Sequence, residues 1–308
     1  MKHGTPKKMM ITGVSGLLGN NLALYFRDRF EVVGIYHTHK VDIEGIRTVC
    51  VELCSAEETA EAIRRFTPDI IIHCAALASP DLCEVNRDLA ERVNVASVAN
   101  IVEALKDREV KLIYISTDLV FDGEKGNYSE TDTVNPINFY GETKYKGELE
   151  ALRHEKTIVA RTNIFGKNIL DKRSLAEWII YELSNKRQIT GFTDAIFSSI
   201  YTIELARLLE QALEAGLSGI YHFASKDSLS KYEFAVELAK AFGLDTTLIR
   251  PSSIDDFGFT AKRAKNVSLN VIKLGRDIKA DMPTIQSSIQ SFHRDYQNKS
   301  LSCTIQPG

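Results

Sequence analysis

Two short groups of residues carry side chains that could perform acid–base chemistry. Ser116, Thr117 and Asp118 follow one another, and Tyr140 and Lys144 stand four residues apart. On a helix, residues four apart project from the same face, so the lysine's charge can favour the ionised form of the phenol. A hydroxyl nearby could hold a substrate oxygen while the phenol gives or takes a proton, as a carbonyl–alcohol redox centre requires. Taken alone, such a Tyr–Lys pair is more typical of a solvated helical face.

The surrounding sequence places both groups at one side of a predicted sheet. Residues 111–116 form an apolar run typical of a buried strand, so Ser116 and the two residues after it lie at its carboxyl end. In open α/β sheets that end of a strand is where ligands bind. Asn138 follows turn residues and is a suitable N-cap for a helix carrying Tyr140 and Lys144. We therefore expect the strand end and the helix start to converge.

A glycine-rich turn near the amino terminus predicts a nucleotide site. Residues 9–12 read as a strand, the spacing Gly13-x-x-Gly16-x-x-Gly19 follows, and an apolar helical periodicity continues to Phe26. Glycines in such a turn let the backbone bend sharply, let a pyrophosphate approach a helix N-terminus, and let the helix pack closely on the sheet. The alternative is a simple turn before a glycine-bearing helix.

The residues after the second predicted strand, 31–36, bear on the choice of nicotinamide cofactor. A carboxylate there would bind the ribose 2′-hydroxyl of NAD(H), whereas cations accommodate the 2′-phosphate of NADP(H). The residues present are His37, Thr38, His39 and Lys40, and the first acid is Asp42. This favours NADP(H). A metal site at the two histidines lacks a third ligand nearby.

Strands and helices alternate along the first half of the chain. Further strands are expected at 49–53, 69–76 and 157–161, and helices at 57–66 and 89–106, the second of which carries Asn94. Ala75 and Ala76 end an apolar strand and leave room for a flat cofactor group, although tight core packing explains them equally well. The alternation predicts an α/β fold with a doubly wound parallel sheet.

The second half changes rhythm. Helices are expected at 174–185, 202–215, 230–242 and 283–295, a strand at 219–223, and an irregular polar stretch at 190–199. We expect a cofactor-binding domain over residues 1–165, to which a segment of about 195–223 returns. Residues 166–194 and 224–308 then form a smaller substrate-binding domain.

Composition excludes several classes of function. The 308 residues are 44% hydrophobic with a formal net charge of −3, so no global attraction to nucleic acid or to an anionic membrane is indicated. No stretch approaches the ~20 apolar residues of a membrane span. The five cysteines lack paired metal-ligand spacing, and an odd number of them suits a reducing compartment. We expect a cytoplasmic protein without a bound metal.

Together these motifs resemble the extended short-chain dehydrogenase/reductase superfamily. Within it, the stretches that carry the resemblance are similar to the dTDP-4-dehydrorhamnose reductase family; they are Ser-Thr-Asp-Leu-Val-Phe-Asp-Gly at 116–123, Tyr-Ser-Glu-Thr-Asp at 128–132, the run 135–144, Gly147-Glu148, 161–166 and 262–269. The resemblance runs nearly from end to end of the chain. Ala264 departs from it, because the family usually has proline there.

The resemblance implies an NADPH-dependent reductase that delivers hydride to the C4 carbonyl of a nucleotide-linked deoxy sugar. NADH is the alternative cofactor. Tyr140 would protonate the alkoxide, and Lys144 would lower the phenol's pKa and hold the nicotinamide ribose. Thr117, or Ser116 as second candidate, would bind the reacting oxygen, and Asn94 would support the active-site helix. The expected cofactor contacts are Gly13, Ser15, Gly16, Leu17, Leu18, Gly19, His37, His39, Lys40, Cys74, Ala75, Ala76, Tyr140 and Lys144. The expected substrate contacts are Thr117, Asp118, Phe121, Asn163 and Arg263.

Two other functions are compatible with the sequence. The regulatory β subunit of methionine adenosyltransferase shares the implied fold and binds NADP, but this chain keeps Thr117, Tyr140 and Lys144 together. A sugar-nucleotide epimerase or 4,6-dehydratase is the third candidate; a dehydratase needs a glutamate where Leu119 stands. The expected partner is the nucleotide sugar, and a homodimer is compatible with the resemblance. Residues 193–198 do not decide which sugar binds.

Overall fold

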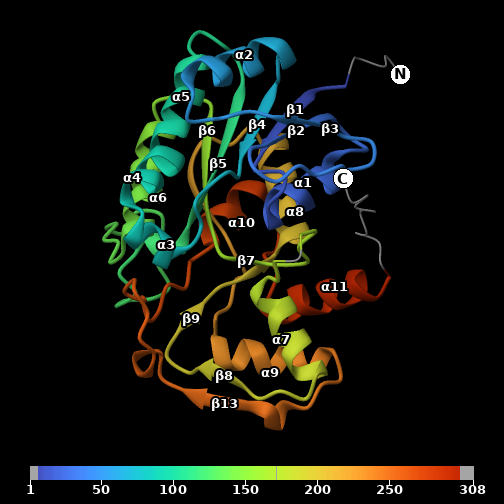
Figure 1. The fold of residues 1–308 in the computed structure, drawn as a ribbon, viewed down its shortest axis with the longest axis vertical. Coiled ribbons are helices and arrows are strands. Elements are labelled where there is room, and N and C mark those ends of the chain that lie inside the picture. The colour runs from blue at the N-terminus through green and yellow to red at the C-terminus, as the bar shows by residue number, and fades with distance from the viewer. Residues whose placement is uncertain (1–5, 171, 299–308) are drawn as a thin grey trace.

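A seven-stranded parallel sheet organises the larger part of the molecule (Figure 1). The computed structural model describes residues 6–170 and 172–298. The strand order is β11-β6-β5-β4-β1-β2-β3, and the strands are β1 (Lys8–Thr12), β2 (Glu31–Tyr36), β3 (Arg47–Cys50), β4 (Ile70–His73), β5 (Lys111–Thr117), β6 (Thr157–Thr162) and β11 (Gly219–Phe223). This confirms the predicted doubly wound sheet. The chain reverses direction across the sheet at β1, which pairs with both β2 and β4. Ligands bind at such a switch point.

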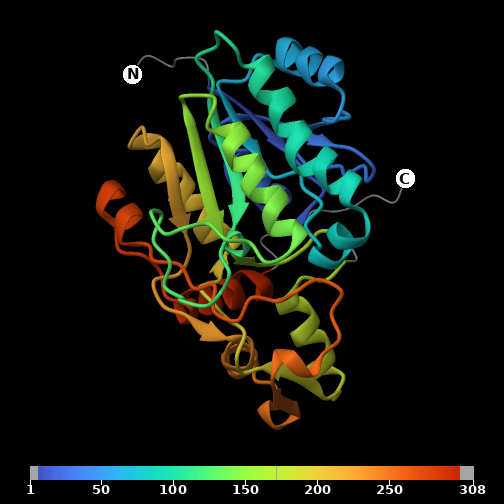
Figure 2. The same ribbon diagram turned by 90° about the vertical axis from the view of Figure 1, so that its left-hand side faces the viewer.

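Helices cover both faces of the sheet, as Figure 2 shows. The first core consists of two apolar layers, one on each face of the sheet. One layer lies beneath α1 (Leu17–Phe26), α8 (Thr202–Glu214) and α10 (Ile272–Ile278). The other layer lies beneath α2 (Ala56–Phe66), α5 (Ser97–Ala104) and α6 (Phe139–Ala151). Burial on both faces explains why strands such as β4 read as continuous apolar runs and not as alternating ones.

The helix predicted over 89–106 is divided in the structure. It consists of α4 (Arg87–Glu91), a π-helical turn at Arg92–Ala96, and α5, with the short α3 (Pro80–Val85) before it. A π turn inserts an extra residue per turn and is frequent at functional sites. Here it contains Asn94, which is buried and bonded to two other segments of the chain.

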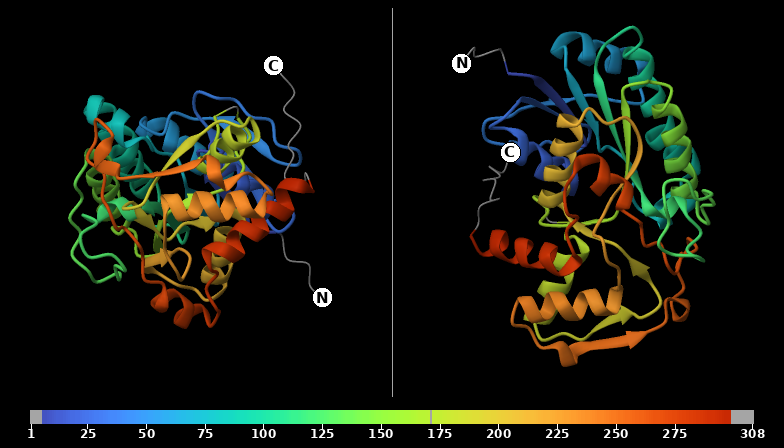
Figure 3. Two further views of the ribbon diagram at one scale, coloured as in Figure 1. Left: turned by 90° about the horizontal axis from the view of Figure 1, so that it is seen from below. Right: turned by 180° about the vertical axis from the view of Figure 1, so that it is seen from behind.

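A second core lies beyond the carboxyl ends of the sheet strands. It is formed by α7 (Leu175–Ser184), α9 (Lys231–Ala241), α11 (Ile285–Gln297) and the parallel pair β8 (Ile189–Phe192) and β13 (Ile249–Ser252). Figure 3 shows α9 lying across that pair. Four two-residue strands complete the structure; they are β7 (Ile164–Phe165), β9 (Ile196–Phe197), β10 (Ile200–Tyr201) and β12 (Leu229–Ser230). No helix among the described residues is long and apolar enough to cross a membrane.

Two sequence expectations for this region are wrong. Residues 190–199 are not irregular throughout, because they contain most of β8 and all of β9. In addition, β13 and α10 were not predicted. β13 has four residues and pairs with the distant β8, and α10 has seven residues, so their own sequences are too short for a periodic signal.

Candidate active site

The carboxyl end of β5 and the start of α6 meet at Thr117 and Tyr140. The side chain of Asn138 accepts a hydrogen bond from the backbone N–H of Gly141 at 2.9 Å, and so caps α6 as predicted. A Cβ atom on Gly141 would lie 2.1 Å from the carbonyl oxygen of Leu119, so only glycine lets the helix approach the end of β5 this closely. As a result, the Tyr140 phenol lies close enough to the Thr117 hydroxyl for that hydroxyl to lower the pKa of the phenol.

Lys144 lies one turn along α6 and is almost fully buried. Its Nζ donates a hydrogen bond to the carbonyl of Ile115 at 2.7 Å and lies 4.2 Å from the centre of the Tyr114 ring. Burial lowers the pKa of Lys144 to about 8, against the attraction of Glu148, which raises it.

The phenol of Tyr140 differs electrostatically from the sequence expectation. Burial raises the pKa of Tyr140 and the charge of Asp118 raises it further, while the hydrogen bond with Thr117 lowers it. The pKa is therefore raised overall and not lowered as the sequence suggested, and a lowering effect of Lys144 stays a prediction. A phenol with a raised pKa keeps its proton at neutral pH, which is the form needed to protonate an alkoxide.

Asp118 is buried beside Thr117 and faces a cavity of about 220 Å³. Its carboxylate accepts hydrogen bonds from the Thr117 hydroxyl at 3.0 Å and from Nδ2 of Asn163 at 2.8 Å. Burial raises the pKa of Asp118 to about 6. Asn163 and Arg263 line the same cavity, so the structure brings these three predicted substrate residues together.

Lys231 lines this cavity too and was missed by sequence reasoning. It is the first residue of α9, directly after the N-cap Ser230. Burial lowers the pKa of its ammonium group, and the nearby charge of Asp118 opposes that shift. The helix expected over 230–242 was the available signal, because it puts Lys231 near a helix start, but nothing in the sequence relates that start to Asp118.

Two of the predicted site residues lie elsewhere. The Ser116 hydroxyl donates a hydrogen bond to Glu148 at 2.5 Å, within a buried ion pair of Glu148 and Arg161. Ser116 therefore serves this pair and not the cavity, because successive strand side chains point to opposite faces. Phe121 is fully buried and stacks on Tyr128 with 4.2 Å between ring centres, so it is a core residue and not a substrate contact.

Asn94 supports the site from behind. Its Oδ1 accepts a hydrogen bond from the backbone N–H of Leu77 at 2.8 Å, and its Nδ2 donates to the Thr143 hydroxyl at 3.0 Å. The π turn is thereby fastened both to the loop after β4 and to α6. This is the placement expected of a residue that supports the active-site helix.

A second cavity, of about 500 Å³, opens at the switch point of the sheet. Its lining includes eight of the predicted cofactor contacts, namely Gly13, Ser15, Gly16, His37, His39, Cys74, Ala75 and Ala76. Gly13 has a φ of +66°, and a Cβ atom there would lie 2.8 Å from the backbone of Ala75. Glycine is therefore required where the first turn meets the end of β4.

The remaining cofactor predictions are not placed in this cavity. The six predicted contacts that do not line it are Leu17, Leu18, Gly19, Lys40, Tyr140 and Lys144. Gly19 instead packs against the carbonyl oxygen of Gly13, and Lys40 is exposed, 3.8 Å from the carboxylate of Asp42.

An acid and a further cation reach the cavity from segments that sequence reasoning did not consider. Glu52 lies just beyond β3, and its carboxylate is 3.1 Å from Nε2 of His37. Arg92, from the π turn, lines the same cavity. The residues directly after β2 therefore do not decide the charge of the cofactor cavity alone. The end of β3 lies beside the end of β2, because the two strands pair, and it brings Glu52 to the same cavity.

A third cavity, of about 550 Å³, continues from the first towards β8 and α7. It shares Lys231, Ile254 and Arg263 with the cavity at Asp118, and its other wall includes Trp178 and Phe192. Among the described residues, no group of three or more histidines, cysteines or acids is placed to hold a metal ion.

Comparisons with known proteins bear on this geometry. The chain is 28% identical over 300 residues to the probable low-salt glycan biosynthesis reductase Agl14 of Haloferax volcanii, covering 94% of this chain and 98% of that protein. It is 30% identical over 277 residues to methionine adenosyltransferase 2 subunit beta of Danio rerio, covering 87% and 84%. The crystal structure of dTDP-4-dehydrorhamnose reductase from Bacillus anthracis str. Ames in complex with NADP superposes with a TM-score of 0.84 at 26% identity, covering 94% and 100%.

The strongest statement of kinship comes from a family model, that of the RmlD substrate binding domain, which matches residues 7–298. That span includes the glycine turn, the end of β5, α6 and the cavities of the second core. The chain therefore belongs to the RmlD substrate binding domain family, within the extended short-chain dehydrogenase/reductase superfamily, as the sequence resemblance indicated.

Proposed function

We propose that this protein catalyses the NADPH-dependent reduction of the 4-keto group of a nucleotide-linked deoxy sugar. The observation that carries the proposal is the meeting of Thr117, Tyr140 and Lys144 beside a cavity walled by Asp118 and Asn163. The named activities of the Haloferax and Bacillus relatives support it. In this proposal the sheet part binds the cofactor, and the part around α7 and α9 binds most of the substrate.

The cavity at the switch point fits a dinucleotide. Its floor is the glycine turn, where the missing Cβ of Gly13 leaves the backbone open to a pyrophosphate. His37, His39 and Arg92 would hold the 2′-phosphate that distinguishes NADP from NAD, and Glu52 would accept hydrogen bonds from the adenosine. When bound, NADPH supplies the hydride.

The chain's own residues supply the proton and hold the substrate. Tyr140, whose raised pKa keeps the phenol protonated, donates its proton to the oxygen formed at C4. The Thr117 hydroxyl, which donates to Asp118 in this structure, donates instead to the C4 oxygen of the bound substrate and so holds that oxygen in place. The positive charge of Lys144 favours the phenolate that remains.

The order of the cavities suggests where the sugar, the diphosphate and the nucleoside of the substrate would bind. Asp118 accepts hydrogen bonds from the sugar hydroxyls beside Tyr140, and the amide of Asn163 donates one to them. Lys231 and Arg263 lie where the two substrate cavities join, and their charges suit a diphosphate. The larger cavity beyond them, with its aromatic wall, is left for the nucleoside.

The test is NADPH consumption with dTDP-4-keto-6-deoxymannose, followed by absorbance. We expect wild-type turnover and a loss of about 10²–10⁴-fold in kcat in Tyr140→Phe, the usual contribution of a general acid. NADPH binding, measured by its fluorescence, should persist in the variant, because phenylalanine keeps the ring and removes only the hydroxyl. Full turnover without the phenol would refute the assigned chemistry.

A second candidate function is that of an NADP-binding regulatory subunit. The observation that favours it is the 30% identity to the Danio rerio subunit over 277 residues, which is slightly above the identity to the Haloferax reductase. This candidate predicts NADPH binding without turnover on any 4-keto nucleotide sugar. The same assay therefore separates the two functions.

A further inference from the structure

Residues 255–260, which we call the strap, form an exposed segment between β13 and α10. All six residues are exposed, whereas Ile254 before them and Ala261 after them are buried. The strap carries two large apolar side chains, Phe257 and Phe259, which are 42% and 38% exposed. In Figure 1 the segment that contains it runs from β13 towards α3. Exposed rings on a segment with fixed ends require an explanation.

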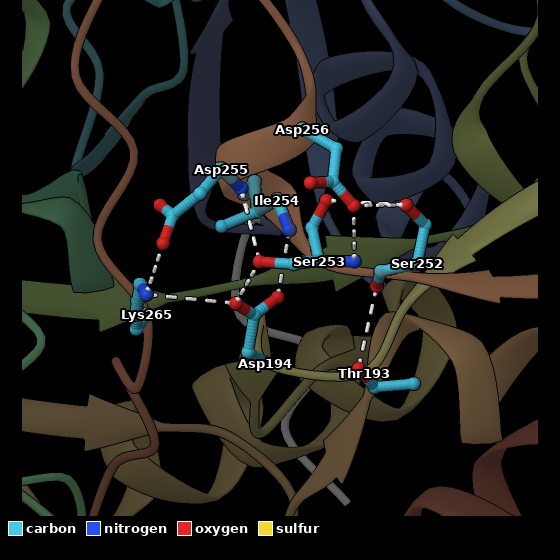
Figure 4. A network of polar contacts seen from close by, with 8 residues as sticks. All are labelled: Thr193, Asp194, Ser252, Ser253, Ile254, Asp255, Asp256 and Lys265. Atoms are coloured by element: carbon cyan, nitrogen blue, oxygen red, sulfur yellow. Dashed lines mark hydrogen bonds and ion pairs between the residues drawn. The ribbon is translucent and has the colours of Figure 1, made fainter.

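One aspartate fastens the start of the strap, as Figure 4 shows. The carboxylate of Asp194 accepts hydrogen bonds from the Ser253 hydroxyl at 2.6 Å and from the backbone N–H of Ile254 at 2.8 Å. The ammonium group of Lys265 lies 3.6 Å from this carboxylate and 2.5 Å from that of Asp255. Asp194 itself precedes β9, so the strap's first end is held by the second core.

A second aspartate fastens the other end in the same manner. The carboxylate of Asp81, in α3, accepts a hydrogen bond from the backbone N–H of Ala261 at 2.9 Å. It also pairs with the guanidinium of Arg263 at 2.5 Å, and these contacts hold the pKa of Asp81 below its usual range. Each anchor thus binds one backbone N–H and one cation. Because Asp81 belongs to the helices over the sheet, the strap bridges the two cores.

The two strap rings form part of the wall of the 550 Å³ cavity. Phe192 meets both edge-on, with ring centres 4.9 Å from Phe257 and 6.0 Å from Phe259. The guanidinium of Arg263 lies 4.4 Å from the centre of the Phe259 ring. Gly258, between the two phenylalanines, has no atom within 4 Å of where a Cβ would stand, so no other described segment packs against the strap at that point. Aromatic faces next to a cation suit a flat ring joined to phosphate.

We propose that Asp81 and Asp194 are positioning residues that fasten the strap at both ends, so that Phe257 and Phe259 close over the aromatic base of a nucleoside diphosphate. The proposal rests on the proposed function for the identity of the ligand. The fastened ends limit the entropy lost when the rings close, because only the residues between them must be ordered.

The first test uses Trp178, the single tryptophan of the chain, which lines the same cavity. Its fluorescence is titrated with dTDP and with inorganic pyrophosphate, which has the charges but no ring. We expect Phe259→Leu and Phe257→Leu to weaken dTDP binding by about tenfold each and to leave pyrophosphate binding unchanged. The matched control is Tyr181→Leu, which removes a ring of similar exposure (37%) from α7 outside the cavity lining.

The second test measures the strap directly by limited digestion with chymotrypsin, which cuts after phenylalanine. We expect dTDP to slow cleavage after Phe257 and Phe259, and pyrophosphate to have no effect. Asp194→Ala and Asp81→Ala should speed the same cleavage several-fold and weaken dTDP binding. Asp245→Ala is the control, because Asp245 accepts hydrogen bonds from Thr247 in the same part of the molecule without touching the strap.

The outcomes separate this proposal from the proposed function. If wild-type protein bound dTDP no better than pyrophosphate, or if dTDP did not slow cleavage of the strap, the proposal that the strap rings close over the base would be wrong. Cleavage in Asp194→Ala and Asp81→Ala equal to that of Asp245→Ala would overturn the anchoring role. A chain that closes its strap on dTDP but never oxidises NADPH with a keto sugar would refute the reductase function alone.

Discussion

Neighbouring hydroxyls at the end of β5 have different partners, and this decides which one takes part in the reaction. Thr117 contacts Asp118 and Tyr140, whereas Ser116 donates to Glu148 in the buried ion pair. We therefore expect Thr117→Ala to lower kcat by at least tenfold, and Ser116→Ala to keep kcat while losing about 1 kcal/mol of unfolding free energy. Steady-state kinetics and urea unfolding check the pair. An inactive but stably folded Ser116→Ala would contradict the assignment.

The two titrating groups of the site predict a bell-shaped pH dependence. Asp118 has a pKa of about 6 and must be ionised to accept hydrogen bonds from the sugar, while Lys144 has a pKa of about 8 and must be protonated to favour the phenolate. We expect kcat/KM to fall below pH ~6, where Asp118 gains its proton, and above pH ~8, where Lys144 loses its own. In Asp118→Asn we expect kcat/KM to be lower than in the wild type and no longer to fall below pH ~6. A fall below pH ~6 that persists in this variant would show that a group other than Asp118 causes it.

Single residues were predicted from the sequence only where a motif singles them out. Thr117, Tyr140 and Lys144 stood in a known spacing, and the structure brings them together. Ser116 and Phe121 belong to the same motif but face the core, a distinction that depends on packing against α6 and on the stacking of Tyr128. Lys231 and Glu52 reach the cavities from distant segments, so no local pattern marks them.

Among the elements, α6 depends on glycine for its distance from the sheet. A Cβ atom on Gly147 would lie 2.2 Å from the Tyr114 hydroxyl oxygen and 2.6 Å from the carbonyl oxygen of Asn94. Alanine has the higher helix propensity by roughly 1 kcal/mol, yet the clash would force α6 away from β5 and the π turn. The clash should win, because overpacking a buried contact costs about 1–3 kcal/mol.

We therefore expect Gly147→Ala to lower the unfolding free energy by about 1–3 kcal/mol and to reduce kcat, since Tyr140 and Lys144 move with the helix. Urea unfolding and NADPH consumption measure the two effects. Leu149→Ala is the matched control on the same helix, because Leu149 is 51% exposed and its loss should change stability by less than about 0.5 kcal/mol. A Gly147→Ala protein more stable than wild type would show that propensity prevails.

The elements themselves were predictable in proportion to their length and burial. β2 and β11 have the predicted bounds, whereas β3 and β4 end three residues earlier than the strands predicted at 49–53 and 69–76. The π turn was not predicted, since its residues keep the periodicity of the surrounding helix and only the contacts of Asn94 favour the wider turn. The pair β8–β13 joins residues about 60 positions apart, and no local sequence feature indicates such a pairing.

At the scale of the whole molecule, the active site depends on both cores at once. Tyr140 and Thr117 come from the sheet and α6, while Lys231 and the strap belong to the second core. Asp81 and Asn138 each bond to the segment 261–263, which links the helices over the sheet to the substrate cavities. The sheet must therefore be intact for the cavities to have their shape.

The stability of that sheet should depend on pH through two buried histidines. His73 on β4 and His222 on β11 are almost fully buried, and burial lowers the pKa of each to about 3. An unfolded histidine titrates near ~6.5, so the unfolded chain gains protons as the pH falls below that value while the folded chain stays neutral. The stabilisation is thus complete above pH ~6.5 and is lost on acidification, by up to about 1.4 kcal/mol per pH unit and histidine.

Asp118 acts in the opposite direction, because its raised pKa lets the folded chain take up a proton first, between pH ~6 and ~4. Single histidine variants isolate the effect from this background. We measure the drop in unfolding free energy between pH 7 and pH 5 by urea unfolding at both pH values. We expect this drop to be about 2 kcal/mol smaller in His73→Gln and in His222→Gln than in the wild type. The two positions lie on different strands of one cooperative sheet, so each variant should show the same change in slope. Variants that keep the wild-type dependence on pH would place the acid sensitivity in the carboxylates instead.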